Sequence, residues 1–64
     1  MILLHLRDNS SILLNPRHIK YVEKYPNSTY VLYDLGDKIT DKMVMETPEE
    51  IQKLINEHFI LFKL

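Results

Sequence analysis

Residues 46–64, ETPEEIQKLINEHFILFKL, contain the one convincing helix signal of this 64-residue chain, and the rest of the sequence is organised around it. Thr47 can cap the helix, Pro48 suits the first helical position, and Glu50 completes a T-x-x-E capping box. The positions spaced to lie on one face of this helix are Ile51, Leu54, Ile55 and His58. We therefore predict a helix from residue 47 that packs this face on a sheet.

The end of this helix is predicted to be an interface between chains. Its apolar residues are Phe59, Ile60, Leu61, Phe62 and Leu64. At about 100° per residue these positions circle the helix, so a sheet that covers one stripe leaves others open. Two chains related by a twofold axis could bury such an apolar patch against each other. The alternative is that the chain leaves the helix near Phe59 and lays residues 60–64 across its own sheet.

Residues 1–46 predict four or five short strands separated by polar turns. The expected strands are residues 2–7, 11–15, 19–25, 29–35 and 43–45, of which the first two form a hairpin. Asn15 and Pro16 should break the sheet in a tight corner or a single helical turn. Ile19 and Val22 are both expected in the core although they stand three apart, which indicates a bulge. Gly36, the only glycine, is expected in a turn that needs a positive φ.

The predicted fold is therefore a single α+β domain over residues 1–64. It consists of an antiparallel meander of four to five strands closed by one C-terminal helix. Such a short chain buries only about 60% of the surface that it exposes when unfolded. Without cysteine it has no disulfide and no thiolate metal site, yet 45% of its residues are hydrophobic. This excess favours burial of apolar surface between chains.

Charge and hydropathy argue against several classes of protein. The net charge of −1 lacks the basic footprint of a nucleic-acid binder. The N-terminus has no basic n-region typical of a signal peptide, and the apolar run at the C-terminus is too short for a membrane span. The expected location is the cytoplasm.

No cofactor, metal or catalytic group is predicted. His5, His18 and His58 fall on three different elements without metal-ligand spacing. No serine lies in a G-x-S-x-G motif. The carboxylates around Gly36 are Asp34, Asp37 and Asp41, and they lack the spacing of a calcium loop, so a solvated turn is expected there. The chain is thus not expected to be an enzyme.

The tyrosines leave one alternative open. Tyr21, Tyr25, Tyr30 and Tyr33 all fall on expected strands, where aromatic rings can stack single-stranded bases. Glu23 and Asp34 lie among them, however, and the net charge does not favour binding to phosphates. Rings packed on the sheet with wet hydroxyls explain the same residues.

Three segments together resemble the FlbD/SwrD family of small bacterial flagellar and swarming-motility proteins. The segments are ILLNPRHIKYVE at 12–23, TYVLYDLG at 29–36 and VMETPEEIQKLI at 44–55. The family usually has a glycine in the first turn, where this chain has DNSS at 8–11. It also has about three residues fewer between the positions of Gly36 and Val44, so the last hairpin loop is expected to be longer here.

The resemblance implies a role in flagellar motor output and supplies no catalytic residues. The function predicted is a non-enzymatic interaction module, flagellar-accessory-like, that self-associates through the C-terminal helix and binds a protein partner. The alternative is a small phage- or mobile-element-encoded regulatory protein that binds nucleic acid or another protein.

Overall fold

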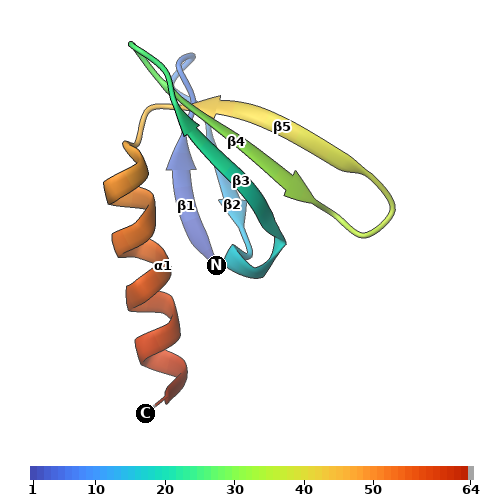
Figure 1. Cartoon of the computed structure of the whole chain (residues 1–64), viewed down its shortest axis with the longest axis vertical. Helices are drawn as coiled ribbons and strands as arrows, with labels where there is room; N and C mark the ends of the chain where they lie inside the picture. The colour runs from blue at the N-terminus through green and yellow to red at the C-terminus, as the bar shows by residue number, and fades with distance from the viewer. Residues whose placement is uncertain (64) are drawn as a thin grey trace.

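The computed structural model describes the backbone of residues 1–63 and the side chains of residues 1–58. The elements follow the chain in the order β1 (Ile2–His5), β2 (Ser11–Leu14), the 3-10 helix η1 (Pro16–His18), β3 (Ile19–Lys24), β4 (Thr29–Asp34), β5 (Ile39–Val44) and α1 (Pro48–Lys63) (Figure 1). All strand pairs among these residues are antiparallel. The predicted α+β fold is confirmed.

The strands are divided between two sheets. One is the β1–β2 hairpin and the other is the β3–β4–β5 meander. The chain passes from the first to the second through η1, where Asn15 Oδ1 accepts a hydrogen bond from Arg17 N at 3.0 Å and Pro16 is buried. Because proline has no N–H for a ladder, the sheet cannot continue through this corner. The predicted break therefore separates two sheets instead of bending one.

The core lies between the two sheets, and α1 closes one side of it by contacting β1 and β3. The buried apolar residues are Ile2, Leu4, Leu14, Val31, Tyr33, Val44 and Ile51. Residues alternate between buried and half-exposed along β4, as the sequence pattern predicts for a strand with one face on the core. From α1, Ile51 enters the core while Leu54 and Ile55 pack against it. The predicted helix face is thus the face that meets the sheets.

The predicted bulge in β3 is confirmed. Ile19 pairs with Tyr33, and after an irregularity Tyr21 pairs with Leu32 and Val22 with Val31. The shift turns both Ile19 and Val22 towards the core, although they stand three apart in the sequence.

The last hairpin differs from the prediction. Its loop is not longer, because β5 already begins at Ile39 and the extra residues lengthen the strand. The turn is closed by a hydrogen bond from Leu35 N to Lys38 O of 2.8 Å, and Asp34 Oδ1 accepts one from Gly36 N of 2.8 Å. Gly36 has the expected positive φ, +97°.

The first turn, which has no glycine at residues 8–11, obtains its positive φ from an asparagine. Asn9 adopts a φ of +71°, a conformation that asparagine tolerates better than most residues. Asp8 Oδ1 accepts hydrogen bonds from the backbone N–H and the hydroxyl of Ser10. The hydroxyl and backbone hydrogen bonds from Ser10 lower the pKa of Asp8.

Candidate functional site

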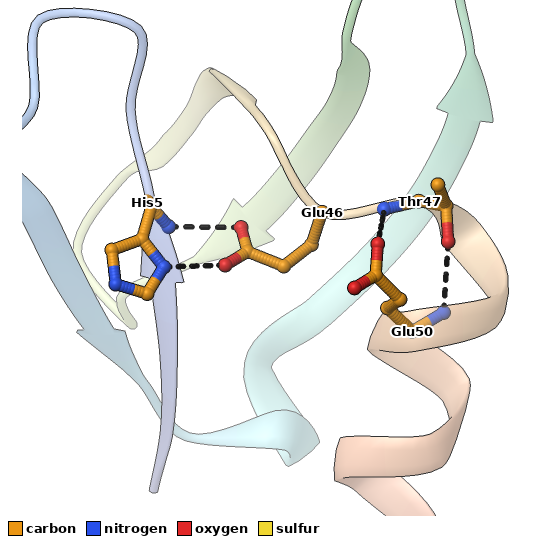
Figure 2. A network of polar contacts seen from close by, with 4 residues as sticks. All are labelled: His5, Glu46, Thr47 and Glu50. Carbon is orange, nitrogen blue, oxygen red and sulfur yellow. Dashed lines mark hydrogen bonds and ion pairs between the residues drawn. The ribbon is translucent and has the colours of Figure 1, made fainter.

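Three segments that are distant in the sequence meet where α1 begins. The end of β5 reaches the end of β1, through a bridge between Leu6 and Val44 and a hydrogen bond of 2.8 Å from Met45 N to His5 O. The next residue, Glu46, then turns its carboxylate onto β1 (Figure 2). We call this meeting point of β1, β5 and the helix start the junction.

Glu46 makes two contacts with the same residue of β1. One oxygen, Oε1, accepts a hydrogen bond from His5 N at 2.9 Å, and the other, Oε2, lies 2.5 Å from His5 Nδ1 (Figure 2). Since a carboxylate can only accept, the proton between them belongs on Nδ1 of the imidazole. Burial raises the pKa of Glu46, but the hydrogen bonds from the side chain and backbone of His5 outweigh it, so the pKa lies below its ordinary 4.5. The side chain of Glu46 is 14% exposed and that of His5 is 56% exposed.

The predicted capping box is confirmed in both directions. Glu50 N donates to Thr47 Oγ1 at 3.1 Å, and Thr47 N donates to Glu50 Oε1 at 2.9 Å (Figure 2). These bonds satisfy two backbone donors that a helix start would otherwise leave open. Thr47 and Glu50 therefore fix the position of α1 relative to Glu46.

A groove runs from the junction along the line where β1 and α1 face each other. It is lined by Leu3, His5, Glu46, Glu50, Lys53, Leu54 and Glu57. Leu3 is 44% exposed, so the groove floor offers apolar surface to solvent. Three carboxylates and a single lysine surround it. The groove lining thus offers apolar contact and charge pairing to a bound molecule.

The remaining histidines do not join this site. His18 lies in η1, and His58 Nδ1 lies 3.2 Å from the amino group of Met1. Burial lowers the pKa of His58, with further lowering from the charges of the Met1 amine and Arg17. Among the described residues, no three histidine, cysteine or acidic side chains are grouped in a way that could hold a metal ion.

The four tyrosines divide between two faces of the sheet. Tyr21, Tyr25 and Tyr30 gather on the outer face of β3 and β4. Tyr33 is 6% exposed and belongs to the core. The prediction of a stacking surface that includes Tyr33 is therefore wrong, because strand alternation places Tyr33 and Tyr30 on different faces of the sheet.

The structure describes the predicted interface at the helix end only in part. The backbone is helical through Lys63, so the alternative in which the chain leaves the helix near Phe59 is not what the structure has. The side chains of Phe59, Ile60, Leu61 and Phe62, and all of Leu64, lie outside the described residues. Self-association through them stays a prediction. No helix in the described part of the chain is long and apolar enough to cross a membrane.

Thr47 and Glu50 are predictable from the sequence, whereas the pairing of His5 with Glu46 was not predicted. The capping residues stand three apart, in a pattern that carries its own signal. His5 and Glu46 are 41 residues apart, and no spacing rule connects them. The position of Glu46 directly before the cap is the one local hint that it could reach outwards from the helix start.

Comparison with known proteins identifies the family of the chain. A family model described as flagellar and swarming motility proteins, FlbD, matches residues 1–59. The matched range includes both sheets, the junction and the groove. No curated protein and no solved structure matches the chain. Because the family model spans nearly the whole sequence, the chain belongs to the FlbD family of flagellar and swarming motility proteins.

Proposed function

We propose that the chain is a non-enzymatic interaction module that supports flagellar or swarming motility, and that it self-associates through the C-terminal end of α1. The family supplies the motility context and favours it over a phage- or mobile-element regulator. The interaction role rests on features of the chain itself.

The observation that carries self-association is the length of α1 relative to the sheets. The last turns of the helix extend past the ends of the strands, away from the core (Figure 1). Among the helix residues whose side chains are described, Ile51, Leu54 and Ile55 form the stripe that packs on the core of the domain. Beyond this stripe the sequence FILF continues the helix where no strand runs alongside. An apolar helix end of this kind is stabilised when a second apolar surface covers it, and another copy of the same helix supplies such a surface.

The interaction role is also supported by the groove beside the junction. Its exposed leucine and its carboxylates suit the side chains of another protein. A partner bound there would contact β1 and residues 50–57 of α1 together.

Light scattering coupled to gel filtration tests the self-association. At about 100 µM, a concentration above the dissociation constant of a micromolar dimer, the full chain should run as a dimer or larger species. Deletion of residues 60–64 should give a soluble monomer with an unchanged circular dichroism spectrum. A full-length monomer at this concentration would refute the proposal.

A genetic test addresses the motility role. Deletion of the gene should reduce swimming or swarming, and the full chain expressed in trans should restore it. The 60–64 deletion should fail to restore motility at equal protein level. Motility that is normal without the gene would contradict the role.

A further inference from the structure

The outer face of the β3–β4–β5 sheet carries a cluster of three tyrosine rings. The centroids of Tyr21 and Tyr30 are 6.3 Å apart with the rings at 64°, and those of Tyr25 and Tyr30 are 6.4 Å apart at 47°. Tyr21 is 50% exposed and Tyr25 is 44% exposed. The cluster therefore presents ring surface to solvent instead of burying it.

Each of two rings in this cluster holds a carboxylate beside it. Tyr21 donates its hydroxyl proton to Glu23 Oε1, and Tyr30 donates to Asp41 Oδ2, both at 3.1 Å. These hydrogen bonds raise the pKa of both tyrosines, so the hydroxyls remain neutral donors. Each carboxylate keeps further lone pairs with which it can accept from another molecule.

The charge on this face is mainly negative. Strand register and alternation turn eight paired residues outwards, and these are Tyr21, Glu23, Tyr30, Leu32, Asp34, Ile39, Asp41 and Met43. The charged ones are three carboxylates, with no lysine or arginine among the eight. Lys20, the extra residue of the bulge, is exposed beside Tyr21 and adds one positive charge at the edge of this face. The apolar members include Ile39, which is 63% exposed.

These features select the chemistry of a partner. A nucleic acid would bring phosphates towards three carboxylates, and a second copy of the same face would bring like charges together. A guanidinium group, in contrast, can stack on a tyrosine ring while its N–H fork reaches a neighbouring carboxylate. Apolar side chains next to it would cover Leu32 and Ile39.

We propose that the outer face of β3–β4–β5 binds a basic protein segment that presents arginine side chains interspersed with apolar ones. This surface lies on strands far from the end of α1 in the chain, and the proposal goes beyond the self-association. A dimer formed through the helix end would carry this face on each copy.

The test is a titration of ¹⁵N-labelled full-length chain with a synthetic peptide of alternating arginine and leucine, followed by NMR. The amide signals of residues 21–32 and 39–43 should shift, and added salt should weaken binding. The same peptide with lysine for arginine should bind more weakly, since lysine lacks the planar fork. The peptide with glutamate for arginine should not bind.

Matched variants distinguish specific binding at this face from nonspecific electrostatic attraction. Glu23→Gln combined with Asp41→Asn should weaken the arginine peptide by roughly fivefold or more. Asp8→Asn combined with Glu49→Gln removes the same charge away from both this face and the groove, and it should leave the affinity unchanged. Tyr21→Ala should weaken binding, whereas Tyr21→Phe should retain most of it.

Three results would overturn the proposal. The shifts could map to the groove between β1 and α1 instead of the outer face. The two charge variants could lose equal affinity, which would indicate nonspecific attraction. A short single-stranded RNA could shift the tyrosine amides at physiological salt, which would make the face a nucleic-acid surface.

Discussion

The two ends of β5 are built in opposite ways. At its end, Val44 is fully buried, bridges to Leu6, and leads into the bonds of the junction. At its start, Ile39 is 63% exposed, and the adjoining turn of residues 35–38 is held by bonds within the turn (Figure 1). The junction joins segments from both halves of the chain, whereas the turn joins neighbours. Stability in so small a domain should therefore depend on the junction and much less on the turn.

Val44→Ala should give the largest loss. Removing two methyl groups from a fully buried position should lower the free energy of unfolding by about 2 kcal/mol, from lost burial and the cavity left behind. Ile39→Ala at the other end of the strand should change it by less than about 0.5 kcal/mol. Urea denaturation followed by circular dichroism measures both. Equal losses would show that the two ends of β5 are not energetically different.

Glu46→Ala should follow, with a loss of about 1.5 kcal/mol at neutral pH, because His5 N and the imidazole both lose their acceptor. Solvent screening at the exposed His5 limits the value. The folded pKa of Glu46 lies below 4.5, so its contribution is present above that pH and disappears as the pH falls through the folded pKa.

The measurement is urea denaturation of the chain and of Glu46→Ala from pH 7 down to pH 3. The two stabilities should converge at low pH. Glu57→Ala, on α1, should lose little at any pH. A gap between Glu46→Ala and the unchanged chain that is constant with pH would contradict this contribution of the Glu46 carboxylate.

Thr47→Ala should cost about 1 kcal/mol through the lost cap. For a domain of this size that corresponds to a fall in Tm of roughly 4–8 °C. Thr47→Ser keeps the hydroxyl and should retain most of the stability. A melt that does not move on Thr47→Ala would mean that the capping box does not hold the junction.

Gly36→Asn should have the smallest effect, within about 0.5 kcal/mol, since asparagine tolerates the positive φ and open space surrounds the position. Gly36→Ala should cost about 1 kcal/mol, because alanine does not adopt this φ readily. The pair of thermal melts would show whether the turn depends on backbone conformation alone. A large loss for both variants would reveal side-chain constraints at the turn.

The sequence predicted the features whose signals are local. The capping box, the alternation of β4, the corner at Asn15-Pro16 and the bulge between Ile19 and Val22 are all patterns within a few residues. The start of β5 was missed because its first residues, ITDK, have no apolar alternation. They become a strand by pairing with β4, where Lys42 lies opposite Val31 and Asp41 opposite Leu32.

The candidate sites followed the same division. Thr47 and Glu50 could be predicted, whereas the pairing of His5 with Glu46 depends on how the two sheets meet. The tyrosine cluster could be predicted from the sequence only in part. Alternation separates Tyr30 from Tyr33, but the contact between Tyr30 and Asp41 requires the register of β4 with β5.

The contact between His5 and Glu46 has a consequence for the order of folding. It closes a loop of 41 residues, which costs about 3 kcal/mol in chain entropy before the contact forms. The β3–β4–β5 meander and the first turn of α1 need only short loops, so we expect them to form before the β1–β2 hairpin docks. The hairpin would then open first under native conditions. Hydrogen exchange of the amide of His5 that is faster than that of Val31 would reveal this partial opening, and equal rates would indicate that the chain opens as a single unit.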